Sequence, residues 1–432
     1  MLKGPMAELP LDDNDNLNLL FSPTQGFDKL AIAVSGGNDS MALMLLAAKW
    51  RSQQEKQPEI TILTVDHGLR VAAKEETAFV ANNAIALGLD VEVLEGSIAN
   101  PETSIQAKAR ELRYQLMGEA MQRRGIDCLL TAHHQDDQAE TVLMRLSRGT
   151  SVTGLGGMSK LRVQSGICLV RPLLDVSRQR LEDFVKSTGF EVVNDPSNEN
   201  SDFERVRWRK TMPVLAELGL KSDKISLSAR RLRRADSALA SISENLYEEQ
   251  FVIDPFGCSF FDLEELLSQP PEIGIRLLAR AIDDAGGETS APLLSRVEAL
   301  YDHLGAGITN FKGLTLGGCF IVVKDGTCIV GREAGRLEID QIFVQPGKSI
   351  RWDNRFQIVV AEDFTSPICV STGQSISRQL LEDLQPGIPF VPMDAVHSAP
   401  VLSADDRILA IGEHVMFDGI DVFRIFGPNA LI

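Results

Sequence analysis

The chain has 432 residues, of which 44% are hydrophobic, and its formal net charge at pH 7 is −17. This length exceeds what one hydrophobic core usually supports, so we expect two or three domains. The negative charge argues against non-specific nucleic-acid binding, and no apolar run reaches the ~18 residues that a membrane span requires.

The six cysteines are scattered and include no Cys-x-x-Cys pair. This pattern argues against a zinc ribbon, a cysteine-held iron–sulfur cluster or a disulfide scaffold, and it is typical of the reducing cytoplasm. Residues 1–26 contain no apolar segment of the kind that signal peptides carry, and they include an acidic stretch. We therefore expect a cytoplasmic protein with a mobile N-terminal tail.

Strand-like and helix-like patterns alternate from residue 29 to about residue 195. The predicted strands are 29–34, 60–65, 89–94, 127–131 and 167–170, and the predicted helices lie near 40–50, 71–87, 104–124, 134–148 and 177–188. This alternation predicts an α/β fold with a doubly wound parallel sheet and helices on both faces. Ligands bind such sheets at the carboxyl ends of the strands.

The pattern changes twice after this region. It becomes helical from about 210 to 305, and after 310 it consists of short β-type runs separated by Gly, Asp and Asn. We expect an α/β domain over 27–215, a helical domain over 216–310 and a smaller α+β domain over 311–432. A further break near 365 is compatible with the composition.

A glycine-rich turn follows the first predicted strand directly. Its sequence is Ser35-Gly36-Gly37-Asn38-Asp39-Ser40. The free N–H groups and the dipole of the helix that follows point into this turn, and the two glycines let an anion approach the backbone closely. The turn lacks the Gly-Lys-Ser/Thr of a P-loop and resembles the pyrophosphate loop of enzymes that cleave ATP between the α- and β-phosphates. The alternative is a plain strand-to-helix turn in which Asp39 and Ser40 act as caps.

A second polar cluster follows the strand predicted at 127–131, at the same edge of the sheet. It runs from His133 to Gly149 and begins His-His-Gln-Asp-Asp. On a helix that starts near residue 134, Asp136 and Glu140 share a face. The two aspartates could support Mg²⁺, whereas zinc would need further ligands that the other histidines do not supply at a suitable spacing. The alternative is that the acids only cap the helix.

Residues 205–234 are basic, although the protein as a whole is acidic. The segment contains ten Lys or Arg residues and only two acidic residues, Glu217 and Asp223. Such a local excess suits a polyanion bound at one place, and the alternative is a solvated helix face.

Several of these motifs, in this order and spacing, resemble those of the tRNA(Ile)-lysidine synthetases. The matching segments are Ser35–Ser40, Val65–Arg70, Ala109–Tyr114, His133–Gly149, Gly154–Met158, Arg171–Leu174, Asp195–Asn198, Leu314–Gly318 and Trp352–Phe356. The resemblance implies an adenine nucleotide hydrolase-like fold. It implies that 27–215 is the ATP-binding catalytic domain and that the domains over 216–310 and 311–432 bind tRNA. It also implies that ATP activates C2 of the wobble cytidine in an isoleucine tRNA with a CAU anticodon. Free L-lysine then replaces the adenylate, so that AMP and pyrophosphate are released.

The resemblance also implies roles for particular residues. ATP would be bound by Ser35, Gly36, Gly37, Asn38, Asp39, Ser40, His67 and His133, with Mg²⁺ at Asp39. Catalysis would involve Asp39, Asp136, Asp137 and Arg205, and lysine would be held by Asp136 and Glu140. The tRNA would be bound by Arg113, Arg205, Arg207, Arg209, Arg231 and Arg234. One departure concerns Val206, which stands where the family pattern has asparagine.

Two other functions remain open from the sequence. A tRNA thiolation enzyme of the same pyrophosphate-loop group would need cysteines paired at a metal or sulfur-transfer site, and this chain has none at such a spacing. A non-catalytic adenine-nucleotide-binding protein would keep the turn at 35–40 without needing the acids at 136–140.

Overall fold

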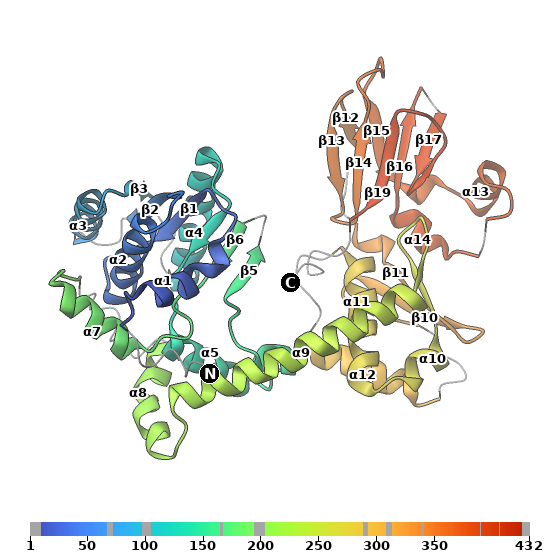
Figure 1. The fold of residues 1–432 in the computed structure, drawn as a ribbon. Helices are drawn as coiled ribbons and strands as arrows, with labels where there is room; N and C mark the ends of the chain where they lie inside the picture. The colour runs from blue at the N-terminus through green and yellow to red at the C-terminus, as the bar shows by residue number, and fades with distance from the viewer. Residues whose placement is uncertain are drawn as a thin grey trace. The chain divides into compact units, whose positions relative to one another are not determined.

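The computed structural model describes residues 10–66, 72–96, 105–164, 167–193, 204–287, 293–307, 313–337, 341–388, 390–405 and 407–425. The chain forms two compact units, Met1–Asp236 and Ser237–Ile432. Their boundary lies within the long helix α9 (Ser222–Gln250) (Figure 1). In the described ranges, no helix combines the length and apolar character that crossing a membrane requires.

A six-stranded sheet forms the centre of the first unit. Its order is β3 (Asp90–Glu95), β2 (Glu59–Asp66), β1 (Lys29–Ala33), β4 (Cys128–Leu130), β6 (Ile167–Val170) and β5 (Leu161–Gln164). All neighbours are parallel except β5, which pairs antiparallel with β6. The chain adds β2 and β3 on one side of β1 and then β4 on the other. The carboxyl ends of β1 and β4 therefore meet at the point where the strand order reverses, which is where such sheets bind ligands.

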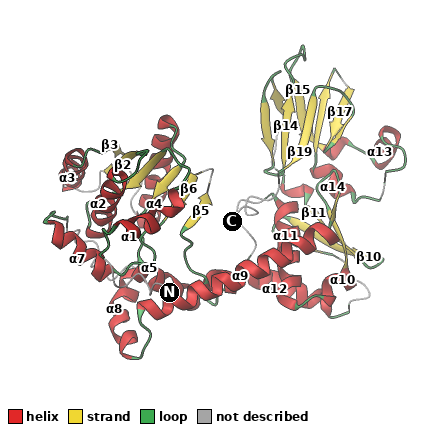
Figure 2. Ribbon diagram, viewed as in Figure 1, coloured by secondary structure: helices red, strands yellow, loops and turns green. Residues whose placement is uncertain are grey.

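Helices cover both faces of this sheet (Figure 2), which confirms the predicted doubly wound α/β fold. Along β1, Leu30 and Ile32 pack into one core with α2 (Asn38–Ser52), α3 (Ala72–Ala86) and α7 (Arg178–Thr188). Ala31 belongs to a second core, together with Met117 and Met121 of α4 (Ile105–Arg124). The near-continuous apolar sequence of β1 follows from burial on both faces.

The expectation of a mobile tail over 1–26 is wrong for the part that the structure describes. Residues Asn14–Phe21 form α1 and Ser22–Thr24 form η1, a 3-10 turn. Leu17 and Phe21 are fully buried, and the Phe21 ring stacks on Trp50 with 4.8 Å between centroids. The i, i+3, i+4 spacing of Leu17, Leu20 and Phe21 is that of an amphipathic helix. Residues 1–9 lie outside the described ranges.

Three further helices of the first unit lie between β4 and β5 or after β6. They are α5 (Gln135–Leu146), α6 (Val152–Leu155) and α8 (Glu204–Glu217). The N-terminal half of α9 belongs with them, because Ile225 and Ala229 share a small core with Ala139, Val142 and Leu143 of α5. The helix that begins just after β4 is therefore packed against the segment that carries the basic run.

The second unit contains an antiparallel sheet in the order β7 (Val252–Ile253), β8 (Ser259–Asp262), β11 (Thr327–Arg332), β10 (Cys319–Lys324) and β9 (Leu314–Leu316). The helices that pack with this sheet are α10 (Leu263–Ser268), α11 (Pro271–Gly286) and α12 (Leu294–Gly305). Because β8 pairs with β11, the expected boundary near 310 is wrong: it would cut through one sheet. Local sequence could not reveal this pairing, since more than sixty residues separate the two strands.

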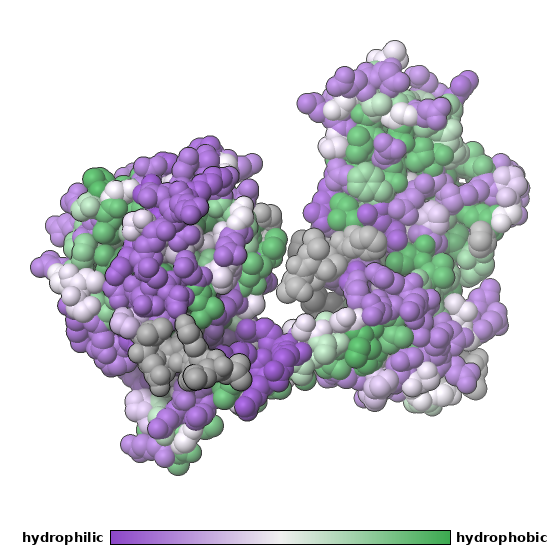
Figure 3. Space-filling view, viewed as in Figure 1, coloured by the Kyte–Doolittle hydropathy of each residue, from purple (hydrophilic) through white to green (hydrophobic). Residues whose placement is uncertain are grey.

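Two more antiparallel sheets complete the second unit and share one core. The first has the order β12 (Ile342–Val344), β15 (Ile368–Thr372), β16 (Pro400–Ala404), β17 (Arg407–Ile411) and β18 (His414–Val415). The second has the order β13 (Ser349–Trp352), β14 (Phe356–Val360) and β19 (Ile420–Arg424). The remaining elements are η3 (Ala334–Arg336), η4 (Gly373–Ser375), α13 (Arg378–Leu384) and α14 (Met393–Ser398). A break near 365 is also wrong, because strands on both sides of it build this core. Hydrophobic patches mark the visible face of these sheets (Figure 3).

Candidate active site

The turn between β1 and α2 forms the first half of the site. The Ser40 hydroxyl donates to the carbonyl of Gly37 at 2.9 Å and accepts from the backbone N–H of Ser35 at 3.2 Å. Gly37 occupies the N-cap of α2 and supplies no side-chain cap to it. The first N–H groups of α2 therefore face the turn without a capping side chain, which suits an anion such as a phosphate chain.

Gly36 is required in this turn for two reasons. Its φ is +84°, a backbone conformation that L side chains rarely adopt. A Cβ on this residue would also lie 3.0 Å from Cγ2 of Val193, whose N–H donates to the Gly36 carbonyl at 2.9 Å. Gly37 is less constrained, because its Cβ would meet only the Ser35 hydroxyl at 3.8 Å.

The second half of the site is the start of α5, which follows β4. His134 is the N-cap: its Nδ1 accepts from the N–H of Asp137 at 3.3 Å, and Oδ2 of Asp137 accepts from the N–H of His134 at 3.1 Å. This reciprocal pair is a capping box, in which two free N–H groups of the helix terminus are satisfied. It fixes the Asp137 side chain at the first turn of α5.

Two arginines of α8 contact the acids of α5. Arg205 donates through Nε to Oε2 of Glu140 at 2.7 Å and through a terminal nitrogen to Oδ1 of Asp137 at 2.8 Å. Arg209 donates through Nε to Oε1 of Glu140 at 2.9 Å and lies 3.8 Å from Oδ1 of Asp137. Glu140 is 1% exposed, so its charge is stabilised by both guanidinium groups. We call these four residues the α5–α8 cluster.

These contacts shift the pKa values of two members of the cluster, Asp137 and Arg209. Burial opposes the charged form of Asp137, but His134, Arg205 and His133 together hold the pKa of this carboxyl below its usual value. Burial also opposes the charge of Arg209, but the contacts with Glu140 raise its pKa. Asp137 is therefore ionised at neutral pH and able to attract a cation or accept a proton.

His134 joins the two halves of the site. Its Nε2 lies 3.4 Å from Oδ2 of Asp39 in the glycine turn and 3.5 Å from Oδ2 of Asp137. Burial opposes protonation, but the hydrogen bond to Asp39 and the charges of the carboxylates raise the pKa of His134. Sequence reasoning missed this residue. The capping-box spacing between His134 and Asp137 was the available signal.

His133 and Asp136 have other surroundings. The Nδ1 atom of His133 is 2.9 Å from the Thr131 hydroxyl, and burial lowers the pKa of His133 to about 4. The carboxylate of Asp136 accepts from the N–H of Arg178 and from the Ser222 hydroxyl. Asp136 and Glu140 have the predicted i, i+4 spacing on α5, but they contact different groups, because Glu140 is joined to Asp137 by the arginines.

The segment Gly154–Met158 is held against α5 and α9. Gln138 donates to the carbonyl of Met158 at 2.9 Å and accepts from its N–H at 2.7 Å, and Arg145 donates to the carbonyls of Gly154 and Gly157 at 3.0 Å each. Arg233 of α9 donates to the carbonyls of Gly156 and Met158. Arg233, like Arg205 and Arg209 of the same basic run, therefore makes contacts within the protein.

The other predicted nucleic-acid contacts are more dispersed. Arg207 of α8, Arg113 of α4, and Arg231 and Arg234 of α9 are exposed. Val206 is buried on α8, where valine leaves no polar group unsatisfied. His67, predicted to bind ATP, lies outside the described residues.

The glycine turn also contains polar atoms that fit a ligand. Within the described ranges, Nδ2 of Asn38 and Oδ1 of Asp39 are buried without a hydrogen-bond partner. No group of three or more His, Cys, Asp or Glu in these ranges is arranged to hold a metal. Mg²⁺ commonly binds through one or two carboxylates together with phosphate oxygens and water, so Asp39 alone fits this ion when ATP is bound.

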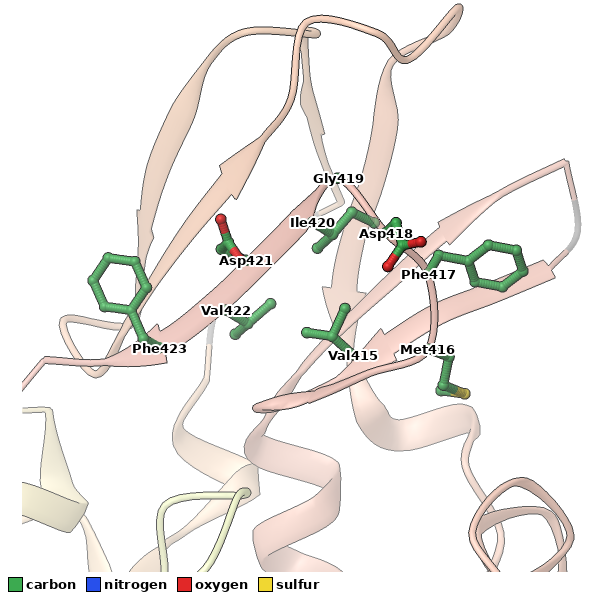
Figure 4. Close-up of a pocket in the computed structure, with 9 residues that line it drawn as sticks. All are labelled: Val415, Met416, Phe417, Asp418, Gly419, Ile420, Asp421, Val422 and Phe423. Atoms are coloured by element: carbon green, nitrogen blue, oxygen red, sulfur yellow. The ribbon is translucent and has the colours of Figure 1, made fainter.

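A pocket of about 540 Å³ in the second unit has a different character (Figure 4). It is lined by Val415, Met416, Phe417, Asp418, Gly419, Ile420, Asp421, Val422 and Phe423. Its lining is apolar or acidic and contains no cation, so it does not suit a phosphate.

Comparison with known proteins agrees with this geometry. Residues 11–215 match the PP-loop domain family. A tRNA(Ile)-lysidine synthase of Bradyrhizobium sp. is 40% identical over 304 residues, covering 67% of this chain and 84% of the relative. The tRNA(Ile)-lysidine synthase of Rhodopseudomonas palustris is 40% identical, covering 66% of this chain and 82% of the relative. That of Anaplasma marginale is 32% identical, covering 88% of this chain and 84% of the relative. The chain therefore belongs to the tRNA(Ile)-lysidine synthase family and is an enzyme of the ligase class.

Proposed function

We propose that the protein ligates lysine to C2 of the wobble cytidine of an isoleucine tRNA with a CAU anticodon, through an adenylated tRNA. The observation that carries the proposal is the link from Asp39 through His134 to Asp137. It couples a turn suited to phosphates with a cluster of charges suited to an amino acid. Membership of the lysidine synthase family supports the same assignment.

The first step forms a bond between the C2 carbonyl oxygen of the cytidine and the α-phosphorus of ATP, and pyrophosphate leaves. The N–H groups of the glycine turn and the hydroxyls of Ser35 and Ser40 would bind the phosphates, and Asn38 Nδ2 would donate to them. Mg²⁺ held at Asp39 would neutralise phosphate charge. Arg205 and Arg209 would stabilise the charge that develops near the α-phosphate.

The second step forms a bond between a lysine amine and C2, and AMP leaves. An amine with a pKa of ~10.4 is protonated at neutral pH, so it must lose a proton before it attacks. The ionised Asp137 carboxylate is our choice for the group that receives this proton. Glu140 would share in binding lysine, since a carboxylate that accepts two guanidinium hydrogen bonds retains further lone pairs.

The tRNA would lie against the exposed arginines of α4, α8 and α9 that the sequence singled out. These are Arg113, Arg207, Arg231 and Arg234. The anticodon is single-stranded, so its bases can be splayed out and the wobble cytidine can enter the site. A reaction on tRNA would place the protein in the cytoplasm.

The test is incubation of the purified protein with ATP, Mg²⁺, labelled lysine and a transcript of the tRNA with a CAU anticodon. We expect lysine in the tRNA that hydroxylamine does not release, because the link is to a base and not an ester. A transcript with a GAU anticodon is the control and should stay unlabelled. Label that never enters the CAU transcript would refute the proposal.

A further inference from the structure

We infer that Asp136 is a positioning residue that sets the start of α5 against α7 and α9, and that its charge does not bind lysine. The inference rests on the proposed function, because the residue that it positions is Asp137. It changes the role that the sequence suggested for Asp136. Of the three carboxylates of α5, Asp137 and Glu140 would then contact substrates, and Asp136 would hold the helix in place.

The contacts of Asp136 identify its neighbours. Its Oδ2 accepts from the backbone N–H of Arg178 at 2.9 Å, and its Oδ1 accepts from the Ser222 hydroxyl at 2.8 Å. Arg178 is the first residue of α7 and Ser222 is the first residue of α9. One carboxylate therefore connects the N-termini of three helices, and it satisfies an N–H group that α7 leaves free at its first turn.

Neighbouring contacts fix the same point of α5. The N–H of Gln135 donates to the carbonyl of Val176 at 2.9 Å, and the Ser226 hydroxyl donates to the carbonyl of Gln135 at 3.2 Å. Nδ1 of His134 lies 3.8 Å from Oδ2 of Asp136 and already accepts from the N–H of Asp137. Asp136 is thus engaged with structural donors, whereas Asp137 and Glu140 are engaged with arginines.

The position of Asp137 depends on these contacts. Asp137 is the next residue, and His134, two residues before Asp136, links it to Asp39. A shift of about 1 Å in a reacting group can cost ~100-fold in rate. Loss of the Asp136 contacts should therefore lower kcat and leave the affinity for lysine nearly unchanged.

Asparagine and alanine at position 136 separate the two roles. In Asp136→Asn the amide oxygen can accept from Arg178, and the amide nitrogen can donate to the Ser222 hydroxyl, so both contacts survive without the charge. We expect Asp136→Asn to keep kcat and the KM for lysine within about threefold of wild type. We expect Asp136→Ala to lose about tenfold or more in kcat with KM within about threefold.

The outcomes are distinguishable. A KM for lysine that rises tenfold or more in Asp136→Asn would overturn the inference, because the charge would then bind the substrate. Wild-type kinetics in Asp136→Ala would overturn it as well. If Asp136→Ala does not fold, Ser222→Ala and Ser222→Thr replace it: alanine should lower kcat and threonine, which keeps the hydroxyl, should restore it. Equal kcat in these two variants would contradict the inference.

Failure of the proposed function would appear separately. In that case the wild-type protein would not incorporate lysine at all. The contacts of Asp136 would then be tested by thermal unfolding without ligands. Asp136→Asn should match wild type and Asp136→Ala should unfold at a lower temperature, and equal unfolding temperatures of all three proteins would contradict the positioning role.

Discussion

One arginine–carboxylate cluster in each unit can be compared, because the two have similar compositions and their arginines differ in exposure. In the α5–α8 cluster of the first unit, the side chains of Arg205 and Arg209 are 35% and 33% exposed. In the second unit, Asp353 binds Arg355 at 2.8 Å and Arg332 at 3.2 Å, and these arginines are 2% and 7% exposed. We call the latter three residues the Asp353 cluster.

The Asp353 cluster has a structural explanation. Arg355 also donates to the carbonyl of Ser398 at 2.6 Å, so it joins the turn after β13 to the end of α14. This turn lies so close to the C-cap of α11 that a Cβ on Gly287 would be 2.3 Å from the Asp353 carbonyl. Buried and enclosed ion pairs of this kind hold segments together, whereas half-exposed pairs can exchange partners for a ligand. The exposure of the arginines, and not the composition, separates the proposed catalytic role of the α5–α8 cluster from the structural role of the Asp353 cluster.

The largest expected effect is on catalysis by the α5–α8 cluster. Asp137→Asn keeps the size of the side chain and removes its charge and basicity. We expect lysine incorporation to fall by about 100-fold or more, because general bases contribute factors of about 10² to 10⁴. ATP binding, measured by calorimetry, should persist. Incorporation within threefold of wild type would remove Asp137 from the mechanism.

The same substitution in the buried cluster should act on stability. Asp353→Asn removes the carboxylate charge that Arg332 and Arg355 contact, and breaking a buried pair in this way costs about 3–5 kcal/mol. Asparagine tolerates the positive φ of +45° at this position, so the backbone is not the cause. Denaturant unfolding measures the loss. A cost below about 1 kcal/mol would contradict the structural role.

The site should also respond to pH through His133. Its folded-state pKa of about 4 lies below its ordinary value, so the unfolded chain binds the proton more readily between pH 4 and 6.5. Stability should therefore fall as pH is lowered through this window, by on the order of 2–3 kcal/mol from this residue. His133→Asn should flatten the slope. The raised pKa of His134 has the opposite effect on the pH dependence of stability. This residue is present in both the wild type and His133→Asn, so the difference between their slopes reports on His133.

The smallest expected effect concerns the exposed arginines of α9. The double variant Arg231→Gln, Arg234→Gln should raise the KM for tRNA several-fold. It should also make the slope of log K against log salt concentration shallower by the equivalent of about one to two phosphate contacts. The KM for lysine should not change. Lys56→Gln is the matched control, because Lys56 pairs with Asp28 just before β1, at the opposite edge of the sheet. Equal effects of both changes would refute a tRNA surface on α9.

The sequence predicted the parts of the fold whose signals are local. The apolar strand 29–34, the glycine turn and the acids of α5 could all be recognised from patterns a few residues long. The partners of those acids could not, because Arg205 meets Asp137 across 68 positions of the chain. The same limit applies to Asp136 and Glu140: helical spacing shows that they share a face but not which donors approach each of them.

The contrast between the clusters is tested most directly by one paired measurement. Lysine incorporation and the unfolding temperature are determined for Arg205→Met and Arg355→Met, with incorporation expressed per folded molecule. We predict that Arg205→Met loses incorporation and keeps its unfolding temperature within a few degrees. Arg355→Met should unfold at a clearly lower temperature and retain incorporation while folded. Incorporation by Arg205→Met at the wild-type rate would contradict the assignment of the α5–α8 cluster to catalysis.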